Sequence, residues 1–189
     1  MGKKHRIFIA INLPENIKKE LGEYKDKWPE LPAKWTKPEN IHITLAFIGY
    51  LNEEGILEIQ NTVNKVAKNY KPFLINLTKI SYGPPKTTPP RMVWAIAEKS
   101  EEYISLCDSL KKALLALPKI SFKPENRETV PHITLARIKE WEWRRIEPEE
   151  RPEIEESINS SFQVNSIDLM ESVLKREGPA YTILKSFNL

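Results

Sequence analysis

Two identical stretches hold the residues of this chain that are best suited to moving protons. Residues 42–46 are His-Ile-Thr-Leu-Ala, and residues 132–136 repeat them letter for letter, although the chain has only three histidines. Because side chains alternate along a strand, His42 and Thr44 would lie on one face, roughly 6–7 Å apart. The second copy would present its imidazole and hydroxyl in the same way. Each copy is therefore a candidate half of a reaction site.

Two imidazoles and two hydroxyls meet the requirements for breaking a phosphodiester without a metal ion. One neutral imidazole can take a proton from water while the other, charged, protonates the leaving oxygen, since the free pKa of histidine is ~6.5. The hydroxyls can donate hydrogen bonds to the non-bridging phosphate oxygens, and Arg137 could add positive charge. Neither copy has a carboxylate or a cysteine at ligand spacing, and Cys107 is the only cysteine. We therefore expect no metal site.

A single His-x-Thr on a strand is more often a structural pair than a functional site. The sequence around the two copies must therefore show whether they are functional. Four features occur in the same order in both halves at similar spacing, which indicates an internal duplication. They are Arg-x-x-x-Ala-Ile from Arg6 and from Arg91, Lys-Pro-Glu-Asn at 37–40 and 123–126, the two His-x-Thr stretches, and Phe-x-x-Asn from Phe73 and from Phe162. No packing requirement would place His and Thr on the same face twice, so the duplication favours a functional interpretation.

Composition places the chain among ordinary globular proteins. Of its 189 residues 40% are hydrophobic and 29% charged, and the net charge of +3 is too weak to indicate a polyanionic partner by itself. No stretch resembles a signal peptide or a membrane span, so we expect a cytoplasmic protein without membrane association. The length suits a single domain with two lobes. We expect a monomer, because the duplication already supplies both halves of the site.

Hydrophobic periodicity predicts alternating strands and helices. In chain order we expect strand 6–12, helix 17–28, extended segment 33–36, strand 41–48, a helix capped by Asn52, strand 73–81, strand 91–98, a helix capped by Ser100, strand 131–138, exposed loop 139–151, a short helix over 153–159 and a terminal hairpin turning at 177–179. The proline-rich segment 83–90 should be a stiff, extended connection between repeat 1 (about 6–82) and repeat 2 (about 91–189).

These elements predict an α+β fold of two pseudo-symmetric lobes from the internal duplication. Each lobe would be a small antiparallel sheet with helices on its outer face, and a central cleft would lie between the lobes. The residues that alternate with the motif side chains, Ile43, Leu45 and Phe47, should face the helices. The polar side of each motif strand would then line the cleft.

The residues quoted above resemble those of the 2H phosphoesterase superfamily. The best match is its RNA 2′,3′-cyclic phosphodiesterase branch, also called the 2′-5′ RNA ligase family. The resemblance covers nearly the whole chain: the opening strand followed by Leu-Pro at 13–14, both His-x-Thr motifs, Pro-Arg-x-x-Trp at 90–94, Arg137, and Gly-Pro-Ala-Tyr at 178–181.

The resemblance implies hydrolysis of the terminal 2′,3′-cyclic phosphate of RNA, tRNA halves included, to a 2′-phosphomonoester without a cofactor. It also implies reversible, ATP-independent 2′-5′ joining of RNA ends. It assigns His42 as the proton donor, His132 as the proton acceptor, and Thr44 and Thr134 as phosphate binders.

The resemblance also associates Arg137 with the phosphate end of the substrate. Strand alternation would place Arg137 on the face opposite His132, so this role requires Arg137 to lie past the end of the strand. Phe8, Trp35 and Tyr181 are candidates for stacking on RNA bases.

Two other functions remain open at this point. One is a non-catalytic module that binds RNA ends or nucleotides, and whose binding would survive loss of His42 or His132. The other is a 2H phosphodiesterase for small cyclic nucleotides, which the dependence of the rate on substrate length would distinguish from an enzyme acting on RNA ends.

Overall fold

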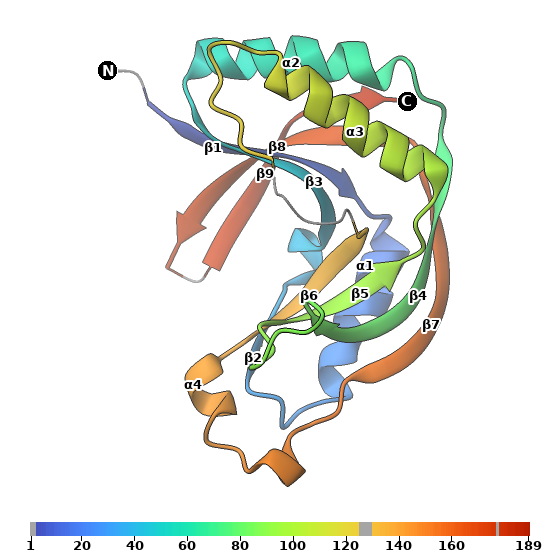
Figure 1. The fold of residues 1–189 in the computed structure, drawn as a ribbon, viewed down its shortest axis with the longest axis vertical. Coiled ribbons are helices and arrows are strands. Elements are labelled where there is room, and N and C mark those ends of the chain that lie inside the picture. Colours follow the sequence, from blue (N-terminus) through green and yellow to red (C-terminus); the bar gives the residue numbers. More distant parts are fainter. Residues whose placement is uncertain (1–2, 125–129, 177) are drawn as a thin grey trace.

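The structure, a computed structural model, describes residues 3–124, 130–176 and 178–189, and it has an α+β fold as predicted (Figure 1). The elements in chain order are β1 (His5–Asn12), α1 (Glu15–Glu23), η1 (Tyr24–Asp26), β2 (Ala33–Trp35), η2 (Pro38–Asn40), β3 (His42–Leu51), α2 (Glu53–Ala67), β4 (Phe73–Gly83), β5 (Met92–Ala97), α3 (Glu101–Leu115), β6 (His132–Ile138), α4 (Glu140–Trp143), η3 (Pro148–Glu150), β7 (Glu155–Val164), β8 (Ser166–Lys175) and β9 (Gly178–Asn188).

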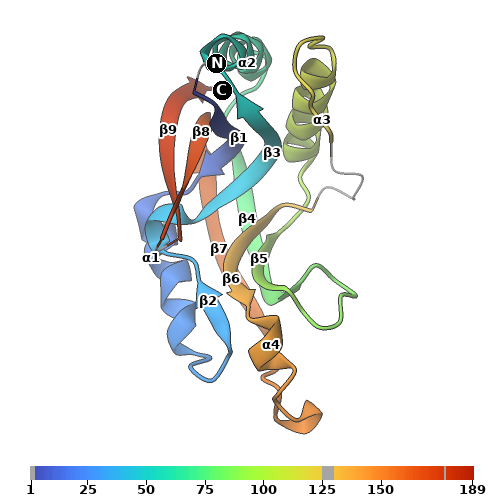
Figure 2. The same ribbon diagram turned by 90° about the vertical axis from the view of Figure 1, so that its left-hand side faces the viewer.

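The two strands that carry the motifs lie side by side at the centre of one sheet. The sheet order is β7-β4-β5-β6-β3-β1-β8-β9, and β2 pairs with the end of β6. Strands β3 and β6 share the antiparallel pair Ile43 and Ile133. A pseudo-twofold axis therefore passes between these two isoleucines. It relates a first lobe, β3-β1-β8-β9, to a second lobe, β6-β5-β4-β7 (Figure 2).

Each lobe takes strands from both halves of the sequence. Strand β4 pairs with β5 and β7 in the second lobe, whereas β8 pairs with β1 in the first. The predicted equivalence of Phe73 and Phe162 is therefore wrong. These residues lie on neighbouring strands of the same lobe, where Phe73 pairs with Val164 and Phe162 pairs with Ile75. The counterpart of β4 under the pseudo-twofold axis is β8.

The proline-rich segment 83–90 is not an extended connection. It joins β4 to β5, which pair antiparallel starting from Gly83 and Met92, so the chain reverses its direction within the segment. The peptide bonds before Pro84 and Pro89 are cis. The sequence indicated correctly that these prolines cannot pair in a sheet, but the segment is the loop of a hairpin.

The helices cover one face of the sheet and build a single core with it. Helices α2 and α3 pack against each other and against β3 (Figure 1). Helix α1 lies against β7, where the Ser160 hydroxyl donates a hydrogen bond to Glu20 at 2.9 Å. The predicted caps are confirmed: Asn52 accepts from the Gly55 amide at 3.0 Å, and Ser100 accepts from the Tyr103 amide at 3.1 Å. We call this apolar layer between helices and sheet the helix-side core.

Two predicted helices differ in the structure. The helix expected over 153–159 is the strand β7, in which Ile158 and Phe162 are buried. Buried residues four positions apart fit two periods of a strand as well as one turn of a helix. Pairing of this segment with β4 stabilises the strand. The helix expected over 17–28 ends at Glu23 and continues as the 3-10 turn η1.

The segment 139–151 is only partly the exposed loop that the sequence predicted. It contains α4 and η3, and Trp143 is buried edge-on against Tyr82, with ring centroids 5.4 Å apart. Trp141, by contrast, is largely exposed. Burial of Trp143 anchors this segment to the second lobe.

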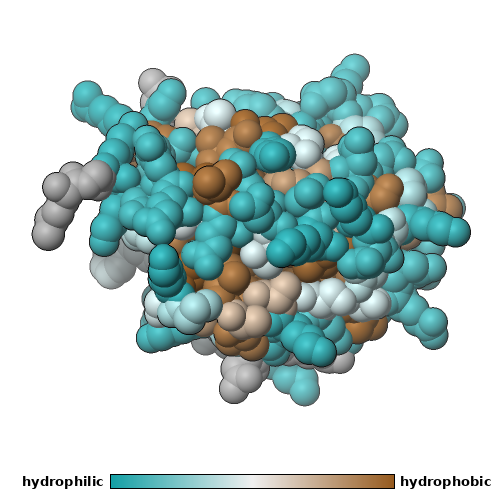
Figure 3. Space-filling view, turned by 90° about the horizontal axis from the view of Figure 1, so that it is seen from above, coloured by the Kyte–Doolittle hydropathy of each residue, from teal (hydrophilic) through white to brown (hydrophobic). Residues whose placement is uncertain are grey.

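The face of the molecule above α2 and α3 is mainly hydrophilic, with small separate hydrophobic patches (Figure 3). Exposed apolar residues on these helices include Leu57, Ile104 and Leu115. Across the residues that the structure describes, none of the helices combines the length and the apolar character needed to cross a membrane.

Candidate active site

The four motif side chains surround the central pair of isoleucines. Ile43 and Ile133 are fully buried in the helix-side core. The residues that flank them point to the opposite face of the sheet and are half-buried. We call this opposite face the motif face. The strand alternation predicted from sequence thus brings together His42, Thr44, His132 and Thr134.

Each imidazole is held by the same backbone contact. Nδ1 of His42 donates to the carbonyl of Asn40 at 2.8 Å, and Nδ1 of His132 donates to the carbonyl of Val130 at 2.8 Å. A carbonyl oxygen can only accept, so Nδ1 carries the proton in both neutral rings. Nε2 is then the nitrogen that can take up or release a proton. Nε2 of His42 lies 3.0 Å from the Thr44 hydroxyl.

Different aromatic residues support the two histidines. In the first lobe the rings of Phe8 and Tyr181 each lie 5.1 Å from the His42 ring, and they lie 5.1 Å from each other. In the second lobe the Trp94 indole stacks on the His132 ring at 3.8 Å and 25°. Rings packed in this way restrict the rotation of both imidazoles.

Trp94 belongs to the site although the sequence did not single it out. It pairs with Thr134 in register, which places its indole beside the motif. Gly83 packs so closely against this indole that a Cβ there would lie 2.2 Å from it. The available signal was Pro-Arg-x-x-Trp at 90–94. It showed a tryptophan in the strand but did not show that this residue would stack on His132.

A β-bulge brings Arg137 to the motif face. The residues before and after Leu135, namely Thr134 and Ala136, pair with consecutive residues of β5, so Leu135 has no partner there. Leu135 and Ala136 both enter the helix-side core. The alternation therefore shifts by one residue, and the next side chain, Arg137, returns to the face of Thr134.

Contacts with one sulfur atom confirm this placement. Sδ of Met92 lies 3.9 Å from the Thr134 hydroxyl and 3.7 Å from Nη1 of Arg137. The expectation that Arg137 faces away from His132 unless it lies past the strand end is wrong, because Arg137 is within β6. The arginine and the motif share one face because of the bulge.

The first motif strand contains the equivalent bulge. Thr44 and Ala46 pair with consecutive residues of β1, which leaves Leu45 without a partner. Ala46 enters the helix-side core, and Phe47 returns to the motif face, where its ring lies 6.1 Å from the ring of Phe8. The prediction that Phe47 faces the helices is therefore wrong, and its side chain is 53% exposed.

The aromatic candidates for base stacking occupy three different environments. Phe8 is only 2% exposed and lies beneath His42, Phe47 and Tyr181. Trp35 stacks on Trp28 at 6.4 Å and 2° and packs against the helix-side core. Only Tyr181 is partly accessible on the motif face, so the structure does not bring the three together.

Two arginines act electrostatically on Tyr181. Burial raises the pKa of the Tyr181 hydroxyl, and the positive charges of Arg137 and Arg6 oppose this shift. Arg137 belongs to the second lobe and Arg6 to the first, so cationic groups of both lobes act on Tyr181.

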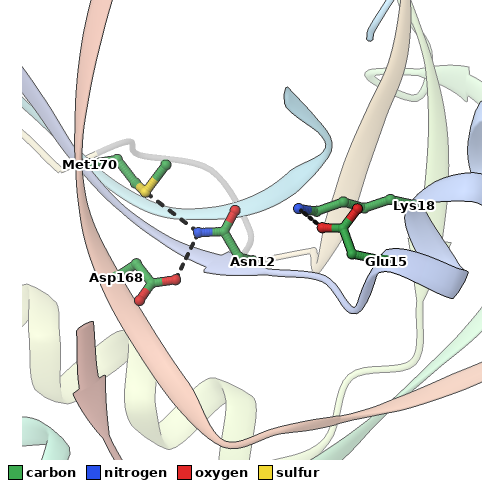
Figure 4. Close-up of polar contacts among 5 residues, drawn as sticks. All are labelled: Asn12, Glu15, Lys18, Asp168 and Met170. Carbon is green, nitrogen blue, oxygen red and sulfur yellow. Dashed lines mark hydrogen bonds and ion pairs between the residues drawn. The ribbon is translucent and has the colours of Figure 1, made fainter. Parts of the chain in front are cut away.

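A polar contact to the buried Asp168 supports the strand next to His42. Asn12 pairs with His42 in register, and its amide donates to Asp168 at 2.7 Å and contacts Sδ of Met170 at 3.5 Å (Figure 4). Asp168 is 4% exposed. The contact ties β1 to β8 on the motif face, beside His42.

The same region holds a lysine close to the site. Nζ of Lys18 contacts Glu15 at 2.8 Å (Figure 4), and the Lys18 side chain is only 11% exposed. Its charge acts on His42 and lowers the pKa of that imidazole. Neither Lys18 nor Asn12 had a signal in the sequence, because both depend on how α1 and β8 approach β3.

Burial lowers the pKa of His42 below its usual ~6.5. The hydrogen bond to the Asn40 carbonyl opposes this shift, and the charges of His132 and Lys18 add to it. We therefore expect the Cε1 proton of His42 to titrate below pH 6.5 in NMR spectra. The variant His132→Ala should raise the midpoint, because it removes a like charge, and inorganic phosphate should raise it too, because an anion favours the charged ring. A midpoint above 6.5 in the unliganded protein would contradict this prediction.

In residues 3–124, 130–176 and 178–189, no three His, Cys, Asp or Glu side chains form a group that could hold a metal ion.

Comparisons with known proteins relate the chain to one family. The model of the family described as LigT like Phosphoesterase matches residues 11–94 and 99–181, each of which contains one motif. A Methanothermobacter thermautotrophicus protein named RNA 2′,3′-cyclic phosphodiesterase is 32% identical over 98% of this chain and 100% of its own length. A protein of the same name from Methanocaldococcus jannaschii is 30% identical over 96% of this chain and 99% of its own.

Solved structures agree with these matches. A crystal structure of a Thermus thermophilus protein has a TM-score of 0.82 and 30% identity, and covers 97% of both chains. The crystal structure of E. coli LigT complexed with 3′-AMP has a TM-score of 0.78 and 25% identity, and covers 99% of both chains.

Proposed function

The chain belongs to the LigT-like phosphoesterase family, and on that premise we propose that it is an enzyme that opens the terminal 2′,3′-cyclic phosphate of RNA to a 2′-phosphomonoester. The observation that carries the proposal is the pair of histidines beside Ile43 and Ile133, each with Nδ1 bound to a carbonyl. Relatives that match nearly the whole chain are named RNA 2′,3′-cyclic phosphodiesterase.

The reaction needs one base and one acid on opposite sides of phosphorus. Nε2 of His132 takes a proton from water, and the water oxygen forms a bond to phosphorus. The bond between phosphorus and O3′ breaks, and Nε2 of His42 gives its proton to O3′. The products are a 2′-phosphate and a free 3′-hydroxyl. The same steps with a 5′-hydroxyl of RNA in place of water yield a 2′-5′ linkage without ATP.

The hydroxyls and the arginine stabilise the phosphate during this exchange. Thr44 Oγ1 lies at Nε2 of His42, and Thr134 Oγ1 has a weak contact with the sulfur of Met92. A non-bridging oxygen would be a better acceptor than that sulfur. Arg137, which shares the Met92 contact, would supply the charge that matches the increased negative charge in the transition state.

The lowered pKa of His42 is compatible with its role as the proton donor. In the unliganded protein the neutral ring is favoured, because the charged ring would be buried beside Phe8 and Tyr181. The negative charge of a bound phosphate favours the charged ring. Binding of the substrate would thus protonate the donor at the place where the proton is needed.

RNA is the partner that these observations favour, and both motifs lie on one chain, so we propose that a monomer suffices. E. coli LigT, similar over 99% of both chains, has been crystallised with 3′-AMP, which supports a nucleotide at the corresponding position. The proposed minimal substrate is an RNA 3′ end with a cyclic phosphate.

Turnover of a short RNA ending in a 2′,3′-cyclic phosphate, measured with EDTA present, tests the proposal. ³¹P NMR distinguishes the expected 2′-phosphate from a 3′-phosphate. Binding of the RNA without turnover would instead favour a non-catalytic binding module. Turnover of free 2′,3′-cyclic AMP as fast as that of RNA would favour an enzyme for small cyclic nucleotides.

A further inference from the structure

The hairpin of β8 and β9 is bonded to the segment that leads into the first motif. Strand β9 is the last strand of the sheet order on the side of the first lobe, and it pairs with β8 along its length (Figure 1). At the start of β9, the carbonyl of Pro179 accepts a hydrogen bond from the side-chain amide of Asn40 at 3.0 Å. Asn40 lies two residues before His42. The hairpin therefore contacts the chain just before the histidine.

Asn40 also supplies the contact that fixes the ring of His42. Its backbone carbonyl accepts the hydrogen bond from Nδ1 of His42 at 2.8 Å, while its side chain donates to Pro179. One residue thus bonds to the histidine through its backbone and to β9 through its side chain. The partner of Nδ1 sets which ring nitrogen is free for proton transfer. The direction of the Asn40 carbonyl therefore sets where Nε2 of His42 points.

The turn that carries this carbonyl, η2, is only three residues long. Two backbone hydrogen bonds close it: the Asn40 amide donates to Lys37 at 2.8 Å, and the Ile41 amide donates to Pro38 at 3.1 Å. These bonds fix the shape of the turn but do not attach it to another element. The Ile41 side chain holds the turn from the helix-side core, where it is buried. The hydrogen bond to Pro179 attaches the turn to a second element, β9.

Strand β9 also contacts the histidine ring itself. Tyr181 follows Pro179 by two residues, and its ring lies edge-on to that of His42, with centroids 5.1 Å apart and planes at 89°. The strand therefore acts on His42 at two points, directly at the ring and, through Asn40, at Nδ1. A shift of the start of β9 would change both contacts.

The second motif has a different residue at the equivalent position. Val130 lies two residues before His132, and its carbonyl accepts from Nδ1 at 2.8 Å, as the carbonyl of Asn40 does in the first motif. The valine side chain has no hydrogen-bond donor, so it cannot attach its carbonyl to another strand in this way. The two motifs thus share the backbone contact and differ in the side chain that could anchor it.

We propose that Asn40 is a positioning residue that couples the β8–β9 hairpin to His42. The inference rests on the proposed function, in which His42 gives its proton to O3′, and adds the contact that keeps this histidine aligned. With Asn40 bound to Pro179, the carbonyl is held and Nε2 stays directed toward the leaving oxygen. Without this hydrogen bond, the carbonyl moves with η2, and the neutral ring exchanges between its two tautomers.

Asn40→Val tests the proposal, because it gives the first motif the residue that the second motif has at this position. It keeps the backbone carbonyl and removes the amide donor. We expect kcat for RNA with a terminal 2′,3′-cyclic phosphate to fall roughly three- to tenfold, the effect of one net hydrogen bond, with KM nearly unchanged. In long-range ¹H–¹⁵N spectra recorded above the pKa of both rings, the His42 nitrogens should move toward the average of the two tautomers, and those of His132 should not.

Gly178→Ala perturbs the same contact from the other side. Gly178 has φ of 131°, where a side chain is strained, and a Cβ there would lie 3.2 Å from Nζ of Lys34. The substitution should displace the start of β9 without changing Asn40, and it should give the same selective change in the His42 spectrum. Val130→Asn is the reciprocal control, and it should leave the spectrum of His42 unchanged.

The spectra and the rates separate positioning from a general structural effect. His42 nitrogen shifts that stay at the wild-type values in Asn40→Val would overturn the proposal, as would an equal change in both histidines. A selective change at His42 with unaltered kcat would show that the hydrogen bond does not serve the reaction and would overturn it too. If the wild type does not turn over the RNA, the proposed function fails, while the spectra still show whether Asn40 positions His42.

Discussion

Replacing either motif histidine with alanine is expected to lower kcat for cyclic-phosphate hydrolysis by roughly 10²–10⁴-fold. The structure gives both rings the same geometry, with Nδ1 bound to the carbonyl of Asn40 or Val130. In the proposed mechanism one ring takes a proton while the other gives one, so neither can replace the other. The rate of each variant is measured with saturating RNA ending in a 2′,3′-cyclic phosphate, with EDTA present.

The third histidine provides a matched control. His5 contacts Glu171 at 2.6 Å and has no place among the motif side chains. His5→Ala should therefore keep most of the activity. The double variant of His42 and His132 should be little worse than either single variant, because the two rings act as a unit. Unchanged turnover in His42→Ala or His132→Ala would contradict the proposed mechanism.

The sequence was sufficient to predict that the four motif side chains lie together. Identical motifs in a duplicated chain predicted that four side chains would share one face, and the pairing of Ile43 with Ile133 is how the fold achieves this. The two-residue period of a strand is enough to place these side chains, because that period holds within each three-residue motif.

The two-residue alternation of side chains is interrupted directly after the motif in each strand. Leu45 and Leu135 are bulged, so the positions of Phe47 and Arg137 could not be obtained by counting from the histidines. A bulge depends on how two strands pair, and the residues of one strand do not determine it. The bulges redirect an aromatic side chain in the first lobe and a guanidinium in the second.

The exchange of strands between the lobes could not be predicted from the sequence either. Duplication suggested that each half folds by itself, whereas β4 crosses to the second lobe and β8 returns to the first. The stacking of Trp94 on His132 follows from the pairing of β5 with β6, a contact between distant segments. Local periodicity predicts elements well, but tertiary pairing decides which elements meet.

Arg137→Ala is expected to lower kcat/KM on the order of 10²-fold, the effect of removing one donor from a charged transition state. Its guanidinium reaches the site because the bulge at Leu135 turns the side chain to the face of Thr134. Arg137→Lys keeps the charge but loses the planar pair of donors, so it should recover only part of the loss. The measurement is kcat/KM at several salt concentrations on the same RNA.

Lys111→Ala provides the comparison. Lys111 is an exposed residue of α3, and its replacement removes the same unit of charge from the outer surface. It should leave kcat unchanged and affect KM only through weak, salt-screened attraction. If Arg137→Ala behaved like Lys111→Ala, with a loss that disappears at high salt, the arginine would serve only long-range attraction. A loss that persists at high salt and reduces kcat as well as kcat/KM requires direct contact with the phosphate, and therefore requires the bulge that brings Arg137 to the motif face.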